Sequence, residues 1–365
     1  MSQIFSEPYS VRCHMRALLN FAALAIVFGA ALLAFTEKSQ AEPSSKPLEI
    51  YFVDVEGGQS TLFVTPEGRS LLIDTGWPGN AGRDADRIVA AAKKAGLSKI
   101  DFVLLTHYHT DHTGGVPQLL AKIPVRTFID HGPNREPGNA ETEQAWEGYQ
   151  KAVSEKSIKR IIAKPGDLLP VKGIRVEVVS ADGALIEKLL PGPGAQNPAC
   201  ATTEKRTADQ TENARSLGTI ITFGTIRILD LGDLTWDKEL ELVCPVNNLG
   251  PIDIFVVSHH GWLQSNSPAL VAAISPRVAI MDNGADKGGS PSSWEIIKNS
   301  PKLEDLWQLH FSNEGGEAHN SKEFFIANLR GADAGNYLKL SVWEDGNCEI
   351  YNSRTQDVKH YPPAH

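Results

Sequence analysis

Residues 104–115 read LLTHYHTDHTGG, and this stretch restricts the fold and the chemistry more than any other. An apolar run ends here in three histidines and one aspartate, namely His107, His109, Asp111 and His112. Neutral imidazoles and carboxylates are the groups that bind zinc. His107 and His109 are two residues apart at the end of an expected strand, so their side chains can point to the same side. A solvated turn would favour glycine or asparagine over three histidines. The stretch therefore predicts a metal site.

Short strand-like runs follow one another from Leu48 onward, with helix-like segments between them. Runs such as DFVLLTH and DIFVVSHHG are apolar throughout, as in a sheet that is covered on both faces. DADRIVAAAKKAGL has helical periodicity and ends at a glycine. Strands and helices mixed in this way predict an α/β layered domain. We expect residues 42–365 to form a single domain.

A long polar loop at residues 191–215 divides this domain into two halves. The segment PGPGAQNPACATTEKRTADQTENAR has no periodicity and little to bury. A loop of this length within a compact domain is usually functional or disordered. We therefore expect a run of strands and helices on each side of it.

More residues of the metal-binding types occur where other apolar runs stop. LLIDTG ends in Asp74, LDLGDL contains Asp233, and VVSHHG presents His259 and His260. Because each follows an expected strand, all of them could converge on one edge of the sheets. This repeated placement supports the metal site more strongly than any single motif.

The first 41 residues have the pattern of a targeting segment. Arg12 and Arg16 precede the run LLNFAALAIVFGAALLAF, and Ser39 and Ala41 are small residues of the kind that a signal peptidase recognises. We expect a signal peptide over residues 1–41. The apolar run is close to the roughly 18 to 20 residues that span a bilayer, so an uncleaved anchor is the alternative. In both cases the rest of the chain is expected in the periplasm or secreted.

The charge and the cysteines limit the partners and the covalent links. A formal net charge of -9 argues against general nucleic-acid binding, so no stable nucleic-acid partner is expected. Contact with a membrane is expected only if the N-terminal segment is uncleaved. Beyond that segment lie Cys200, Cys244 and Cys348, which allow at most one disulfide. We favour Cys200 with Cys244, and three free thiols are the open alternative.

The order of the motifs resembles that of a known superfamily. YFVDVEGGQSTLFV, LLIDTG, THYHTDHTGG, ILDLGD and VVSHHGW together resemble the metallo-β-lactamase superfamily, and are most similar to the soluble hydrolase domain of the bacterial DNA-uptake protein ComEC. The resemblance covers residues 48–351. It implies an α/β fold of the four-layer αβ/βα sandwich type, with two zinc ions at one edge of the sheets.

The resemblance also implies a role for each residue of the site. Its metal ligands would be His107, His109, Asp111, His112, Asp233 and His260. The first two would hold one zinc ion, the next two and His260 would hold the other, and Asp233 would bridge both. Asp74 would brace the metal loop through hydrogen bonds. The sequence does not separate His259 from His260, but we favour His260 as the ligand and His259 as a proton donor.

The chain departs from the superfamily at the first zinc site. Many members carry a third histidine some twenty residues before the bridging aspartate, where this chain offers Asn213 and Ser216. Asn213 could coordinate through its amide oxygen or hold a water molecule, and His131 could replace the missing ligand. His131 could equally be a loop histidine without a metal. The second zinc site is therefore better supplied with ligands than the first.

These assignments predict an exported zinc-dependent hydrolase that uses a metal-bound hydroxide. Asp111 would orient or deprotonate the water, and His259 would protonate the leaving group. The expected substrate is a small molecule or a phosphodiester or similar ester, with Arg135, Lys205 and Arg215 as candidate phosphate-binding residues on rim loops. A β-lactam or lactone ring is the first alternative. The second is a non-catalytic binding protein on the same scaffold, which the missing histidine favours and the intact second site opposes.

Overall fold

We describe the fold from a computed structural model, which covers residues 46–187, 190, 194–331 and 333–364. The expected signal peptide, residues 1–41, lies outside the described residues. Among the helices within them, none has both the length and the apolar character needed to cross a membrane.

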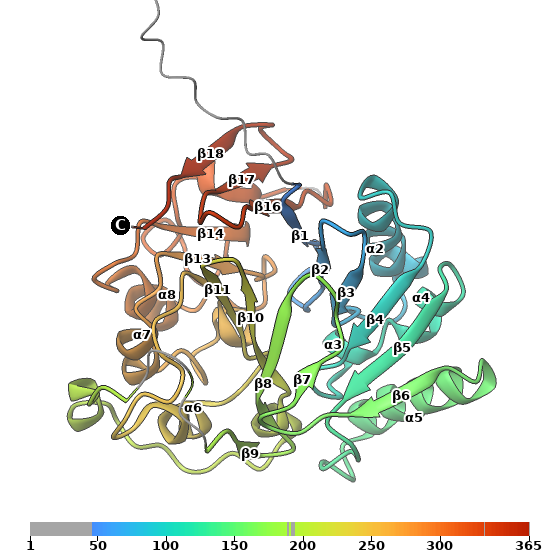
Figure 1. Cartoon of the computed structure of the whole chain (residues 1–365), viewed down its shortest axis with the longest axis horizontal. Coiled ribbons are helices and arrows are strands. Elements are labelled where there is room, and N and C mark those ends of the chain that lie inside the picture. The colour runs from blue at the N-terminus through green and yellow to red at the C-terminus, as the bar shows by residue number, and fades with distance from the viewer. Residues whose placement is uncertain (1–45, 188–189, 191–193, 332, 365) are drawn as a thin grey trace, which may run out of the picture. The chain divides into compact units, whose positions relative to one another are not determined.

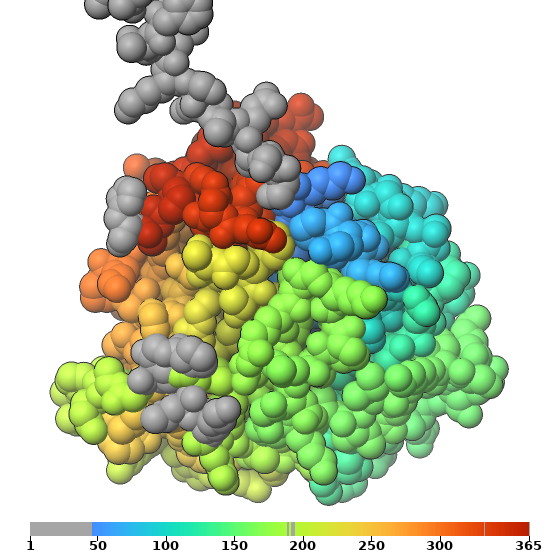
Figure 2. All heavy atoms as spheres, viewed as in Figure 1, coloured from blue at the N-terminus to red at the C-terminus, as the bar shows by residue number. Residues whose placement is uncertain are grey.

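The first of two β-sheets joins the two ends of the described chain (Figures 1 and 2). In spatial order its strands are β18 (Val358–Tyr361), β17 (Cys348–Asn352), β16 (Leu338–Val342), β1 (Leu48–Phe52), β2 (Thr61–Val64), β3 (Ser70–Ile73), β4 (Ile100–Leu104), β5 (Val125–Asp130) and β6 (Lys159–Ile162). The strands from β3 to β6 are parallel, and the other neighbouring strands are antiparallel. Parallel neighbours need crossover connections, which place helices on a face of the sheet.

The second sheet is built from the later part of the chain. Its strands are, in spatial order, β15 (Ile326–Asn328), β14 (Asp305–His310), β13 (Val278–Met281), β12 (Ile254–Val256), β11 (Ile226–Asp230), β10 (Gly218–Phe223), β8 (Arg175–Ala181) and β7 (Leu168–Leu169), with β9 (Ala184–Leu185) paired to β8. The strands from β11 to β15 are parallel. Each sheet thus combines a parallel part with an antiparallel part.

Helices cover the outer face of each sheet (Figure 1). The first sheet carries α2 (Arg83–Lys94), α3 (Thr110–Thr113), α4 (Val116–Leu120) and α5 (Ala140–Glu155), and the second carries α6 (Trp236–Val243), α7 (Pro268–Ile274) and α8 (Pro291–Lys298). Single turns of 3-10 helix are η1 (Asn80–Gly82), η2 (Pro198–Ala201), η3 (Glu212–Arg215), η4 (Ser258–Gly261) and η5 (Glu323–Phe325).

The core confirms the predicted four-layer αβ/βα sandwich. Ile50 and Ile254 belong to the apolar cluster between the two sheets, whereas their neighbours Tyr51 and Phe255 pack against the outer helices. Successive residues of a strand point to opposite faces, so a strand that is buried on both faces is apolar at every position. This is why several strand runs in the sequence lack a polar alternation.

Two parts of the long polar loop are held in place by contacts with the rest of the domain. A disulfide joins Cys200 to Cys244, the pair that we favoured, and Cys348 is a buried free thiol. At the far end of the loop, Glu212 and Asn213 are buried in η3. The expectation that this segment has little to bury is wrong for that end, because backbone N–H groups of Tyr108 and Arg135 donate hydrogen bonds to the carboxylate of Glu212.

Candidate metal centre

The predicted site residues meet because they follow the carboxyl ends of neighbouring parallel strands. Asp74 follows β3 and the segment His107–His112 follows β4, both in the first sheet. Asp233 follows β11, and His259 and His260 lie in η4 after β12, both in the second sheet. Ligand sites of α/β proteins lie beyond these strand ends. The site therefore draws on both halves of the chain.

Four of these residues form a tight buried group, which we call the central cluster: Asp111, His112, Asp233 and His260. One ligand atom from each lies within 4.8 Å of the others. The Nε2 atom of His112 is 3.3 Å from the Oδ2 atoms of both Asp111 and Asp233. The Nε2 atom of His260 is 3.3 Å from Oδ2 of Asp111 and 3.5 Å from Oδ1 of Asp233. Two imidazoles and two carboxylates thus face a common point.

The charge at this point favours a cation. Burial opposes ionisation of Asp233, but the nearby imidazoles, that of His112 foremost, hold its pKa well below the usual value. Burial likewise opposes ionisation of Asp111, yet Lys287 and His112 hold its pKa well below the usual value. Both carboxylates are therefore ionised at neutral pH. Burial lowers the pKa of His260, but the carboxylates of Asp233 and Asp282 and a hydrogen bond to Asp111 outweigh this effect and raise it to about 10.

Several buried polar atoms at the site have no hydrogen-bond partner among the described residues, including Nε2 of His107, Oδ1 of Asp233 and Nδ1 of His260. A buried polar atom without a partner costs free energy, so such atoms usually indicate a missing water or ion. Burial lowers the pKa of His107 well below its usual value, which keeps the imidazole in the neutral form that binds metals. Its Nε2 atom is 3.9 Å from Oδ2 of Asp233. The residues present therefore fit a bound metal ion.

Asp74 lies beside the central cluster and holds the imidazole of His112 in its orientation. Its carboxylate accepts hydrogen bonds from the backbone N–H of Thr106 (2.8 Å) and from the hydroxyl of Thr106 (2.6 Å). It also lies 2.7 Å from Nδ1 of His112. If a metal ion replaced the Nε2 proton of His112, an Nδ1–H that donates to Asp74 would leave Nε2 to bind that ion. This arrangement matches the bracing role that the resemblance implied.

Backbone strain is concentrated at the site. Asp74, His259 and His260 have φ angles of 60°, 54° and 54°, in the left-handed region that normally favours glycine. Such conformations cost roughly 1 to 3 kcal/mol each and gather at functional sites. Glycine would relieve the strain but would remove a carboxylate and two imidazoles. The strained backbone at these positions is therefore explained by the need for the carboxylate and the two imidazoles.

The central cluster does not include every predicted ligand. His109 places its Nε2 atom 2.9 Å from Oε2 of Glu136. His131 lies 3.0 Å from Oε2 of Glu212, and its ring packs against Tyr108, so the structure does not bring it to the metal centre as the replacement ligand. The amide oxygen of Asn213 is buried and has no hydrogen-bond partner among the described residues. The group of ligands around His107 is thus less complete than the central cluster.

The two adjacent histidines take different positions. His260 belongs to the central cluster, and its Nδ1 atom is 3.4 Å from Oδ1 of Asp282 on the opposite side. His259 lies at the margin, with Nε2 at 3.4 Å from Oδ2 of Asp233 and Nδ1 at 3.3 Å from the hydroxyl of Ser265. Asp282 escaped the sequence analysis, although it follows the apolar strand β13 just as the predicted residues follow theirs.

A lysine that the sequence analysis missed also reaches the site. The Nζ atom of Lys287 contacts the carboxylate of Asp111 and lies 4.8 Å from the centre of the Trp77 ring. Lys287 stands in the glycine-containing loop ADKGG, where no periodicity or strand end marks it. Of the three predicted rim cations, Arg135 is held by both oxygens of Asp182, at 2.7 and 2.6 Å.

Comparison with known proteins agrees with this geometry. Residues 54–197 match the model of the metallo-beta-lactamase superfamily. Recombination protein 2 of Haemophilus influenzae is 24% identical over 259 residues, which are 70% of this chain and 27% of that protein. Competence protein ComA of Neisseria gonorrhoeae is 25% identical over 231 residues, or 63% of this chain and 26% of that protein. A metal-dependent hydrolase of Herpetosiphon aurantiacus is 38% identical over 76 residues, or 20% of this chain and 29% of that protein.

The chain thus spans less than a third of the length of these relatives. Among solved structures, the diiron beta-hydroxylase CmlA from Streptomyces venezuelae has a TM-score of 0.38 at 15% identity, over 72% of this chain and 48% of that chain. Rm3 metallo-beta-lactamase has a TM-score of 0.32 at 13% identity, over 72% of this chain and 78% of that chain. The superfamily match includes Asp74 and the whole His107–His112 segment. Residues 54–197 thus carry the sequence signature of a metallo-β-lactamase domain.

Proposed function

We propose that this chain is an exported, zinc-dependent hydrolase that cleaves a phosphodiester or a similar ester. The observation that carries the proposal is the central cluster, in which two ionised carboxylates and two imidazoles lie within 4.8 Å of one another. Nitrogen and oxygen ligands of this kind suit zinc. Export rests on the expected signal peptide at residues 1–41.

Two ions would be held unequally. At the first zinc site His107 and His109 would hold one ion, at the second site Asp111, His112 and His260 would hold the other, and Asp233 would contribute to both. The first site is less well supplied, because His109 is paired with Glu136 at 2.9 Å. When bound, zinc would bring the pKa of a coordinated water towards neutrality and polarise the oxygen of the scissile group.

The chain's own residues would move and hold the protons. Asp111 is ionised and so can accept a proton from the attacking water or orient that water. Burial lowers the pKa of His259 to about 4, so its imidazole is neutral at pH 7. His259 would therefore act at the leaving group as a neutral imidazole, whereas the sequence analysis gave it the role of protonating that group.

A chromogenic phosphodiester tests the proposal directly. We expect the zinc-loaded protein to hydrolyse bis(p-nitrophenyl) phosphate and to leave the β-lactam nitrocefin intact, with both rates read from absorbance. If only nitrocefin is cleaved, the phosphodiester assignment is wrong and the ring-opening alternative replaces it. If neither is cleaved and the protein binds no zinc, the chain is a binding protein on a hydrolase scaffold.

Lys287 provides a sharper test of the substrate's charge. Its ammonium group lies at the metal centre beside Asp111, where it can pair with an anionic oxygen of the substrate. We expect Lys287→Ala to raise KM for the phosphodiester about tenfold, because a hydrogen bond to a charged group contributes roughly 1.5 kcal/mol or more. The value of kcat should change far less. Steady-state kinetics give both constants.

Two controls separate charge from packing at this position. Lys287→Arg keeps the cation and should keep KM near that of the parent protein. A neutral ester such as p-nitrophenyl acetate should be insensitive to Lys287→Ala. An unchanged KM for the phosphodiester in Lys287→Ala would show that this lysine does not contact the substrate.

A further inference from the structure

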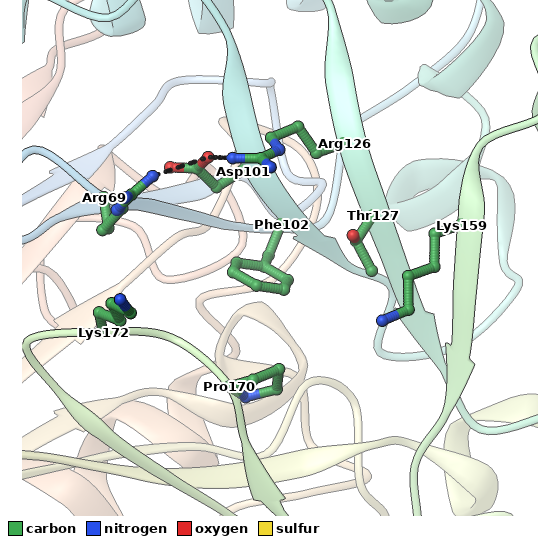
Figure 3. Close-up of a pocket in the computed structure, with 8 residues that line it drawn as sticks. All are labelled: Arg69, Asp101, Phe102, Arg126, Thr127, Lys159, Pro170 and Lys172. Atoms are coloured by element: carbon green, nitrogen blue, oxygen red, sulfur yellow. Dashed lines mark hydrogen bonds and ion pairs between the residues drawn. The ribbon is translucent and has the colours of Figure 1, made fainter.

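A second pocket lies at the opposite ends of the strands from the metal centre, and Figure 3 shows it. Its volume is about 410 Å³. It is lined by residues at the starts of β3 to β6, whereas the metal centre follows the carboxyl ends of strands. Pro170 and Lys172, in the connection from β7 to β8, line it from the second sheet. We call it the basic pocket.

One wall of the basic pocket is a row of side chains across three parallel strands. Phe102 on β4 is paired with Thr127 on β5, and Thr127 is paired with Lys159 on β6. Residues in register on neighbouring strands point to the same face of a sheet. Phe102 packs against the apolar cluster between the sheets, so the whole row faces the second sheet. The backbone of the sheet therefore holds this wall in place, and the wall does not depend on the conformation of a loop.

The charge of the basic pocket is opposite to that of the whole chain. Arg69 and Arg126 share one carboxylate, that of Asp101, at 3.7 and 3.3 Å. Lys159 and Lys172 have no carboxylate within 4.0 Å among the residues that the structure describes. The two arginines are thus paired with Asp101, and Lys159 and Lys172 give the pocket its excess of positive charge, on a chain whose net charge is -9. A concave site with this excess of one sign concentrates ligands of the other sign.

The centre of the basic pocket is apolar. Figure 3 shows the ring of Phe102 and the ring of Pro170 in the middle, with Lys159 on one side and Lys172 on the other. A flat apolar group can pack against an aromatic face, while lysines at the margin bind an anion. Phosphate suits these donors because it carries up to two charges and several acceptor oxygens.

We propose that the basic pocket binds a phosphate monoester whose organic part is flat and apolar. The ring of the ligand would lie between Phe102 and Pro170, and its phosphate would be bound by Lys159 or Lys172. This site is separate from the metal centre and does not depend on the proposed hydrolysis.

Phenylphosphonate tests the proposal, since its carbon–phosphorus bond resists hydrolysis at the metal centre. We expect the zinc-loaded protein to bind it saturably in isothermal titration calorimetry at about 150 mM salt, where weak surface attraction is screened. Lys159→Gln/Lys172→Gln should weaken this binding about tenfold or more, because it removes two charged donors. Hydrolysis of the chromogenic phosphodiester should stay within about twofold of the parent rate, which keeps this test independent of the proposed function.

A matched pair controls for total charge. Lys298 and Lys322 are exposed and lie outside the basic pocket, so Lys298→Gln/Lys322→Gln removes the same charge and should leave binding unchanged. Methylphosphonate lacks the ring and should bind more weakly than phenylphosphonate. The proposal is overturned if binding is not saturable, if the two double variants lose affinity equally, or if the pocket variant retains full affinity. Equal binding of the two phosphonates overturns the apolar part of it.

Discussion

Replacing Asp111 by alanine is expected to lower phosphodiester turnover by about 10³-fold or more, because it removes a metal ligand and the proton acceptor together. The carboxylate of Asp111 lies 3.3 Å from the Nε2 atoms of both His112 and His260, and its loss would leave Asp233 as the one carboxylate of the central cluster. The parent protein and the variant are compared by kcat/KM with zinc in excess. Circular dichroism should show an intact fold, because Asp111 lies beyond the strands in the short helix α3.

Two further variants show what the loss at Asp111 means. Asp111→Asn keeps the shape and removes the charge, and should lose nearly as much activity as alanine. Asp86→Ala removes an exposed carboxylate of α2 and should have no effect on turnover. Full turnover in Asp111→Ala would show that this residue has no part in the reaction.

Removal of the metal is expected to abolish activity completely and reversibly. Dialysis against a chelator should leave a folded protein without turnover, and added zinc should restore the rate. Because a ligand that binds only the folded state stabilises it, zinc should also raise Tm. Metal analysis should find up to two zinc ions per chain, and Asp233→Ala should lower that number because Asp233 faces His107, His112 and His260.

The chelation experiment can also determine which metal ion the protein uses. Restoring the chelated protein with iron or manganese in place of zinc measures which ion supports turnover. Zinc should give the highest rate at equal occupancy, since the central cluster offers two imidazoles and two carboxylates. Undiminished turnover in protein shown by metal analysis to be free of metal would contradict a metal-dependent mechanism.

Much of the fold could be predicted because its signals are local. DADRIVAAAKKAGL predicted a helix that is found as α2, and DFVLLTH predicted a strand that is found as β4. The convergence of Asp74, Asp233 and His260 was also predictable, because parallel strands present their carboxyl ends at one edge. Gly58 shows what the pattern could not explain: a Cβ atom there would lie 2.3 Å from the carbonyl oxygen of Asp111. Only glycine allows that approach of the backbone.

What the sequence could not predict depends on contacts between distant loops. Glu136 meets His109 across 27 positions of sequence, and Lys287 meets Asp111 across 176. Neither Glu136 nor Lys287 follows a strand directly, so no periodicity identifies it. The buried carboxylate of Glu212 lies within a polar segment that has no large aliphatic or aromatic residues to mark it as part of the core. Such residues are found from the tertiary structure alone.

The central cluster takes its residues from both sheets, and this affects the stability of the sandwich. Asp111 and His112 come from the first sheet, while Asp233 and His260 come from the second. An ion held by all four would therefore link the two sheets directly, in addition to the apolar core and the hydrogen bonds, such as that from Gln59 to Asp230, which already join them. The ion could bind to all four residues only while the two halves are assembled. Its binding would therefore stabilise the assembled sandwich against separation of the two sheets. The same four side chains would then serve both catalysis and the stability of the sandwich.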